Sequence, residues 1–180
     1  MSEVATEDET SDAGVVICSC CGKAVAQSDV ELAYKYPDVY HALDTAARSA
    51  PDTFCESNFC VVAGRGLFMR GLIPFPLDGG DEYCIGAWVE LTEHDWRMAR
   101  AMWNESGNDR IPEFDGRLAN HVPLAHEIST LELDVRVQLH DDRRPTFRFV
   151  DTGHPLEDEQ RQGISAHRAL ALSELAGALE

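Results

Sequence analysis

Residues 59–77 read FCVVAGRGLFMRGLIPFPL, and this stretch decides the fold. It holds two segments rich in β-branched and aromatic residues on either side of the Gly-Arg-Gly at 64–66, a pattern that predicts a β-hairpin. Pro74 and Pro76 should end the second strand, because proline cannot donate a hydrogen bond to a neighbouring strand. The main sheet is therefore expected to start with two antiparallel strands.

Three later stretches extend the predicted sheet. The segment YCIGAWVEL (83–91) is apolar on both faces, which is typical of a central strand. Apolar and polar residues alternate in LELDVRVQL (131–139), so one face of this strand should meet solvent. After a short turn, PTFRFV (145–150) alternates again. We expect these last two strands to pair as an antiparallel hairpin.

Helices are expected apart from these strands. Pro37 and Pro51 delimit one predicted helix, Thr92 caps a second, and Pro155 and Ser165 begin two more near the C-terminus. Strands joined by short turns, with helices set apart from them, indicate a fold class. The prediction is α+β, with a mainly antiparallel sheet and flanking helices.

Charge separates a tail from the body of the chain. Residues 1–14 are acidic and lack an apolar period, so we predict a disordered acidic tail ahead of a single α+β domain at 15–180. The formal net charge of −17 argues against nucleic acid as a partner, because phosphates are bound by clustered Lys and Arg. It is compatible with a basic protein partner, although acidic residues also simply keep proteins soluble.

The chain shows no targeting signal. No apolar run approaches the ~20 residues that cross a membrane, and the first residues lack the basic and apolar parts of a signal peptide. We therefore expect a cytoplasmic protein with no membrane partner. In a reducing compartment, its six cysteines should bind metal or stay free rather than form a disulfide framework.

The cysteines suggest a zinc site. Cys18 and Cys21, in CSCCGK, have the C-x-x-C spacing of a metal knuckle, which supplies two thiolates. Cys55 and Cys60, in CESNFC, could supply the other two, so that four sulfurs about 2.3 Å from one ion close a structural zinc site. Cys20 could replace one of these ligands. The fold prediction thus includes an N-terminal zinc-knuckle-like element.

Two other interpretations of the thiols stay open. A C-x-x-C pair can cycle between dithiol and disulfide, although the residues after Cys21 are not a clear helix start. The thiols can also be reduced structural cysteines that pack as small apolar side chains.

A second candidate site lies in loop-like stretches. His121 and His154 occur in NHVP and GHPL, and Asn120 and Arg144 could join them in a small catalytic site. The simpler interpretation is that each histidine bonds a backbone carbonyl. The chain contains no HEXXH, GxSxG, P-loop or GxGxxG motif, so the motifs of several common enzyme classes are absent.

Most of the body resembles a known family. The segments that carry the likeness are CSCCGK, NFCVV, LFMRGLIPFPL, IGAWVELTEHDW, PEFDGRLANHVP and RPTFRFVDTGHPLEDEQRQGIS. Together they resemble the bacterial family catalogued as domain of unknown function 2199. The resemblance implies a fold unit and a metal-like knuckle, but no reaction. Arg117 stands where an aromatic residue is expected, and Gly153 stands where an acidic one is expected.

The expected function follows from these features. We expect a zinc-stabilised binding or interaction module with an acidic surface. The alternatives are a small enzyme that uses the loop residues named above and a thiol redox protein. Convergence of the four loop side chains in one cleft would favour the enzyme.

Overall fold

The computed structural model describes residues 15–17, 24–26, 32–122 and 128–177. The predicted acidic tail, 1–14, and the cysteines of the predicted knuckle, within 18–23, lie outside the described residues. The strands are β1 Val15–Ile17, β2 Ala24–Ala26, β3 Leu32–Ala33, β4 Phe54–Cys55, β5 Phe59–Val62, β6 Gly66–Pro76, β7 Glu82–Leu91, β8 Phe114–Leu118, β9 Asp134–Gln138 and β10 Thr146–Phe149. The helices are α1 Asp38–His41, α2 Thr45–Arg48, α3 Glu93–Met102, the one-turn 3₁₀ helix Asn108–Arg110, α4 Pro155–Gln162 and α5 Ala166–Gly177.

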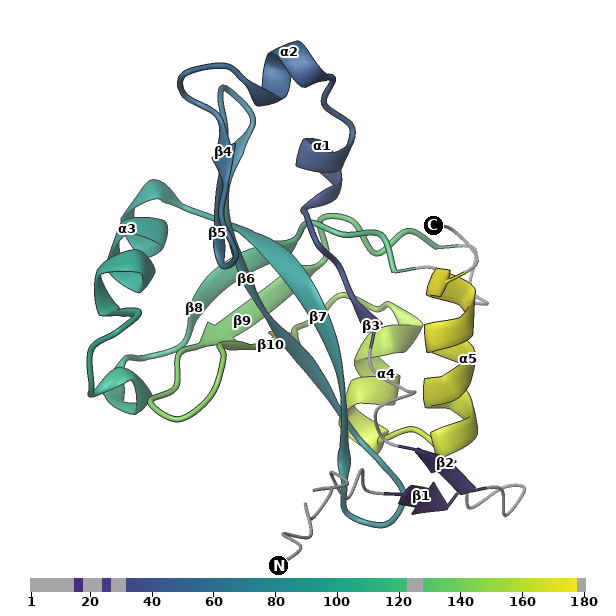
Figure 1. Ribbon diagram of the computed structural model, residues 1–180. Helices are drawn as coiled ribbons and strands as arrows, with labels where there is room; N and C mark the ends of the chain where they lie inside the picture. Colours follow the sequence, from purple (N-terminus) through teal and green to yellow (C-terminus); the bar gives the residue numbers. More distant parts are fainter. Residues whose placement is uncertain (1–14, 18–23, 27–31, 123–127, 178–180) are drawn as a thin grey trace, which may run out of the picture.

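Five strands close into a barrel. The pairings run from β7 through β8, β9, β10 and β6, and β6 pairs again with β7 (Figure 1). All of these pairings are antiparallel except that of β10 with β6, which is parallel where Thr146 faces Leu72. Strand β3 extends β7, and β5 and β4 extend β6. The predicted α+β class is confirmed and most strand pairings are antiparallel as expected, but the sheet is mixed and closes into a barrel with extra strands.

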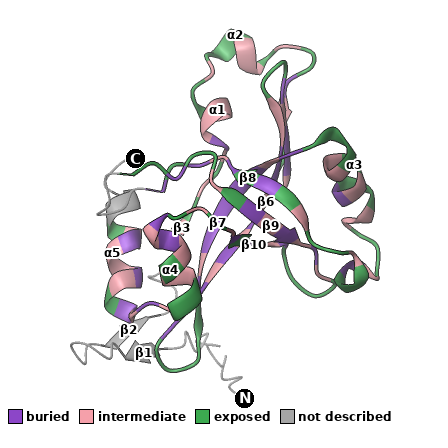
Figure 2. Cartoon of the chain, turned by 180° about the vertical axis from the view of Figure 1, so that it is seen from behind, coloured by how far each residue is buried: buried purple, intermediate pink, exposed green. Residues whose placement is uncertain are grey.

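The barrel encloses the main core. Met69, Ile73, Val89, Val137 and Phe147 are all fully buried, and they come from all the barrel strands but β8 (Figure 2). Burying apolar area at about 25 cal/mol per Å² is the main favourable term in such a fold. The alternating pattern of β9 therefore places its apolar residues inside the barrel, as the sequence predicted.

A smaller apolar cluster lies outside the barrel. It is called the outer cluster here. Its buried members are Cys60, Val62, Phe68 and Trp88, with Val39, Tyr40, Leu43 and other partly buried residues packed against them. The cluster joins β5, β6 and β7 to the segment that carries α1. This packing holds α1 against the extra strands (Figure 1).

Strand β6 ends at Pro76 as predicted, but it runs through Pro74, which does not stop it. The amide of Arg70 donates to the Asn58 carbonyl and that of Leu72 to the Pro145 carbonyl, so these alternate amides point away from β7. Pro74 and Pro76 follow the same alternation. Their missing N–H groups therefore point away from β7, at positions that pair with no other strand, and the ladder with β7 stays intact.

The helix starts were mostly predicted correctly. Thr92 caps α3 by accepting from the Asp95 amide, and α4 begins at Pro155 and ends at Gln162, just before Gly163. The helix expected between Pro37 and Pro51 is instead two short helices, because the Asp44 side chain accepts from the Ala47 amide and starts α2 afresh.

The strand predicted at 131–139 begins later than expected, at Asp134. Glu132 has a φ of 64°, in the left-handed region that an extended strand excludes. Its amide donates to the Leu118 carbonyl over 2.8 Å, which ties this turn to the end of β8. No helix among the described residues is long and apolar enough to cross a membrane.

Candidate functional site

Asn120 is a structural residue. Its side chain is fully buried, and its Oδ1 accepts from the Trp88 amide at 2.8 Å. Its Nδ2 donates to the Tyr36 carbonyl at 2.9 Å and to Asp38 Oδ1 at 2.8 Å. These bonds tie β7 to the start of α1. An amide engaged in this way is held by the fold and is not presented to a substrate.

His121 follows Asn120 on an exposed turn. Its backbone amide, rather than its ring, makes the contact that holds the turn, donating to Asp38 Oδ2 at 2.7 Å. Thr130 closes the same turn, because its hydroxyl donates to the Asn120 carbonyl at 2.9 Å and accepts from the Val122 amide at 2.7 Å. The imidazole of His121 is therefore at the surface, away from the buried bonds.

His154 caps a helix. Its Nδ1 accepts from the Leu156 amide at 3.1 Å, at the start of α4. This bond requires the proton on Nε2, which lies 3.2 Å from the Ile128 carbonyl and donates to it. His154 as a whole is 3% exposed. The simpler interpretation of this histidine, a loop residue bonded to a backbone carbonyl, fits these contacts.

The rest of the HPL-Q-GI segment docks α4 on the barrel. Gln160 accepts from the Phe149 amide at 2.8 Å and donates to the carbonyls of Phe147 at 2.9 Å and Pro74 at 3.2 Å. The Ile164 amide donates to the Pro76 carbonyl at 2.8 Å. This segment therefore holds a helix to β6 and β10, and it supplies no open chemical site.

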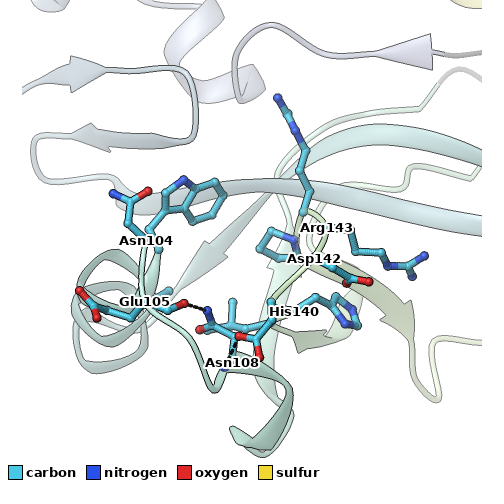
Figure 3. A pocket seen from close by; sticks show the side chains of 12 residues that line it. Asn104, Glu105, Asn108, His140, Asp142 and Arg143 are labelled. Atoms are coloured by element: carbon cyan, nitrogen blue, oxygen red, sulfur yellow. Dashed lines mark hydrogen bonds between the residues drawn. The ribbon is translucent and has the colours of Figure 1, made fainter.

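Arg144 lies apart from the other three loop candidates. It lines a pocket of about 360 Å³ between the end of α3 and the loop that carries His140 and Arg143 (Figure 3). Asn108, 4% exposed, lies at its base and donates to the carbonyls of Met102 and Glu105. None of Asn120, His121 and His154 lines this pocket. The four side chains predicted to form a small catalytic site therefore do not converge.

Two of the four predicted zinc ligands face each other directly. Cys55 of β4 pairs with Cys60 of β5, and both are free thiols. The Cys60 thiol donates a hydrogen bond to Cys55, which lowers the pKa of Cys55; burial opposes this effect and the charge of Arg70 adds to it. The same bond, together with burial, raises the pKa of Cys60.

The other two predicted zinc ligands, Cys18 and Cys21, lie outside the described residues. The strands that flank them, β1 and β2, form a hairpin at the opposite end of the molecule from β4 (Figure 1). Within the described ranges, no group of three or more metal-ligating side chains comes together. The four-thiolate zinc site thus stays a prediction.

A groove with acidic walls opens beside the outer cluster. It has a volume of about 470 Å³. It is lined by Asp38, Val39, Arg65, Phe68, Glu90, Leu118, Ala119, Leu131 and Glu132. Apolar side chains form much of its surface, and Leu131 is 42% exposed although it is a large apolar residue. These residues, which we call the acidic groove, come from the start of α1, from β6, β7 and β8, and from the turn before β9.

The charges around the acidic groove are unequally neutralised. The carboxylate of Asp38 accepts from the Asn120 side chain and the His121 amide, which leaves its charge in place. Glu90 pairs with Arg117 at 3.2 Å. Glu132 forms no ion pair or side-chain hydrogen bond within the described part of the chain, and its backbone is held in a costly conformation. Glu132 therefore presents an exposed carboxylate that is free to meet a cation.

Little in the sequence predicts this groove. Its lining residues are spread from Asp38 to Glu132, so no single stretch of sequence marks it. The alternating pattern of 131–139 predicts that Leu131 lies on the apolar face of a strand. Its exposure became visible only once the turn at Glu132 was known.

Fold and site together define a small mixed-barrel protein with a candidate binding groove. Comparison with protein families agrees with the resemblance noted in the sequence, because residues 17–164 match the family described as an uncharacterized protein conserved in bacteria (DUF2199). The chain belongs to this family. No curated protein and no solved structure matches the chain.

Proposed function

We propose that the protein is a binding module whose acidic groove takes a short segment of a partner protein. The segment would carry a Lys or Arg beside an apolar side chain. The observation that supports this most is the turn Leu131–Glu132, which places an exposed apolar side chain next to an unpaired carboxylate.

The chemistry of the groove favours a basic partner over an acidic one. Its lining includes the carboxylates of Asp38, Glu90 and Glu132 against the single guanidinium of Arg65. The chain as a whole carries a formal net charge of −17, which speeds the encounter with basic partners and repels acidic ones. A cationic side chain would meet Glu132 while an apolar neighbour covers Leu131.

The size and shape of the groove favour a short segment. A volume of about 470 Å³ accommodates only a few side chains. The apolar floor includes Phe68 and Leu118, which are held rigidly by the outer cluster and the barrel core. A preformed floor lowers the entropy lost on binding.

The small-enzyme alternative has less support. The side chains of Asn120 and His154 form hydrogen bonds with backbone groups, and Arg144 lines the separate pocket shown in Figure 3. Zinc at Cys18 and Cys21 would stiffen the N-terminal part of the chain, whereas the proposed contacts with a partner are made by Leu131 and Glu132. The binding proposal is therefore independent of the zinc prediction.

A peptide-display selection on the full-length protein tests this function. Enriched peptides should share a Lys or Arg beside an apolar residue, and they should bind Glu132→Gln and Leu131→Ser at least several-fold more weakly. Both substitutions are at exposed positions, where stability changes by about 0.5 kcal/mol or less. Glu174→Lys, an exposed acid on α5 that does not line the groove, is the matched control and should bind as the natural protein does.

Two outcomes of the selection would count against the proposal. One is a set of enriched peptides without cationic residues. The other is a set of basic peptides that loses affinity equally in the Glu174→Lys and Glu132→Gln proteins, since that would indicate attraction to the overall charge rather than to the groove.

A further inference from the structure

Cys55 and Cys60 occupy a position where two strands bring side chains closest. The Glu56 amide donates to the Phe59 carbonyl at 2.8 Å, so these two residues form a hydrogen-bonded pair of the β4–β5 ladder. Hydrogen-bonded and non-hydrogen-bonded pairs alternate in an antiparallel ladder, so the next pair, Cys55 with Cys60, is non-hydrogen-bonded. Such pairs have Cα atoms about 4.5 Å apart, within the range that a disulfide spans.

The two thiols differ in their access to solvent. Cys60 is fully buried in the outer cluster, whereas Cys55 is half-buried at its edge. A small reagent therefore meets Cys55 first. Cys60, directly opposite, is placed to react with whatever forms on the Cys55 sulfur.

The surroundings of Cys55 suit an oxidation that releases a hydroxyl group. Arg70 is close enough for its charge to act on Cys55, and Arg144 in turn is close to Arg70. The Nε of Arg70 is buried and has no hydrogen-bond partner within the described residues. A guanidinium with a free N–H can stabilise an oxygen atom that gains negative charge.

We propose that Cys55 and Cys60 form a reversible cross-strand disulfide on exposure to a hydroperoxide. In the first step, the Cys55 sulfur bonds to one peroxide oxygen, the O–O bond breaks, and the thiol proton leaves with the second oxygen. Hydrogen peroxide thus yields sulfenic acid on Cys55 and one water. Sulfur supplies the two electrons that the peroxide gains.

In the second step the Cys60 sulfur attacks the Cys55 sulfur. The S–S bond forms, the S–O bond breaks, and the hydroxyl group leaves with the Cys60 proton as water. A dithiol reductant reverses the product by thiol–disulfide exchange. The modification is independent of the acidic groove, since neither cysteine lines it.

Peptide mass analysis of the full-length protein tests this proposal. Arg48 and Arg65 bracket both cysteines, so trypsin releases them on one peptide. After treatment with hydrogen peroxide and then an alkylating agent, this peptide should be lighter by two hydrogens and carry no alkyl group. If dithiothreitol is added after the peroxide and before the alkylating agent, both thiols should be alkylated. Cys84→Ser, which removes the half-buried thiol on β7, is the matched control and should give the same cross-link.

Single-cysteine variants assign the order of the steps. Cys60→Ser should accumulate sulfenic acid on Cys55 that dimedone traps, whereas Cys55→Ser should leave Cys60 unmodified because Cys60 is buried. Dimedone labelling of Cys60 in the Cys55→Ser protein would overturn that order. A peptide with both thiols alkylated after peroxide treatment would overturn the disulfide itself. Thiols that react with the alkylating agent only after a chelator removes zinc would overturn it too, since a metal ion rather than a disulfide would then protect them.

Discussion

Asn120 provides the sharpest test of the claim that the family's loop residues hold the fold. Replacing it by alanine removes one acceptor and two donors from a fully buried position. The Trp88 amide and the Tyr36 carbonyl then lose their Asn120 partner, and the Asp38 carboxylate keeps only the His121 amide.

The expected loss of stability can be worked out from these partners. A buried polar group left without a partner costs about 1–3 kcal/mol, and more when it is charged. Three affected groups, partly relieved by water at Asp38, give about 3–5 kcal/mol for Asn120→Ala. A domain of this size loses about 2–4 °C of melting temperature per kcal/mol, so the midpoint should fall by roughly 10 °C.

Chemical denaturation followed by tryptophan fluorescence measures this loss directly, since Trp88 is one of the bonded partners. Asn104→Ala is the matched control, because Asn104 is exposed at the rim of the pocket in Figure 3 and its loss should cost about 0.5 kcal/mol or less. A change below about 1 kcal/mol for Asn120→Ala, with an unchanged denaturant slope, would refute the structural role assigned to this residue.

Two further substitutions test the turns of the structure. Glu157 accepts from the Thr152 hydroxyl and from the amides of residues 151–153, and these bonds lower its pKa. Because its folded pKa lies below the unfolded value of about 4.3, its stabilisation is present above that value and is lost as the pH falls through the folded pKa. The Glu157→Gln protein should therefore be less stable than the natural protein at pH 7 and should lose less stability on acidification. Urea unfolding midpoints measured across the acid range test this. Parallel profiles of midpoint against pH for the two proteins would contradict it. Glu132→Gly should raise the free energy of unfolding by about 0.5–1 kcal/mol, because glycine adopts a positive φ without strain; a decrease in that free energy would show that Glu132 is not strained.

Local sequence patterns predicted the strands well, but not how they close. The hairpin at 59–77 and the central strand at 83–91 follow from apolar residues bounded by turn residues. The barrel depends on the parallel contact between Thr146 and Leu72, residues far apart in the chain. No local pattern encodes such a contact, so a sheet was predictable and its closure was not.

The candidate site was harder to predict for a related reason. The chemistry of His154 and Asn120 makes them candidates for a catalytic site, but sequence alone does not show that their polar atoms bond buried backbone groups. The spacing of Cys55 and Cys60 alone is compatible with metal binding, whereas the hairpin of β4 and β5, joined by three residues, places them face to face. The acidic groove is assembled from distant segments, and only the fold brings them together.

The central claim, that the acidic groove is the binding surface, is tested most directly by an amide chemical-shift map. The full-length protein labelled with ¹⁵N would be titrated with a peptide enriched by the display selection. The groove predicts the largest shifts at the amides of Val39, Ala119 and Glu132. Largest shifts instead at Asn104, His140 and Arg144, around the pocket in Figure 3, would contradict it.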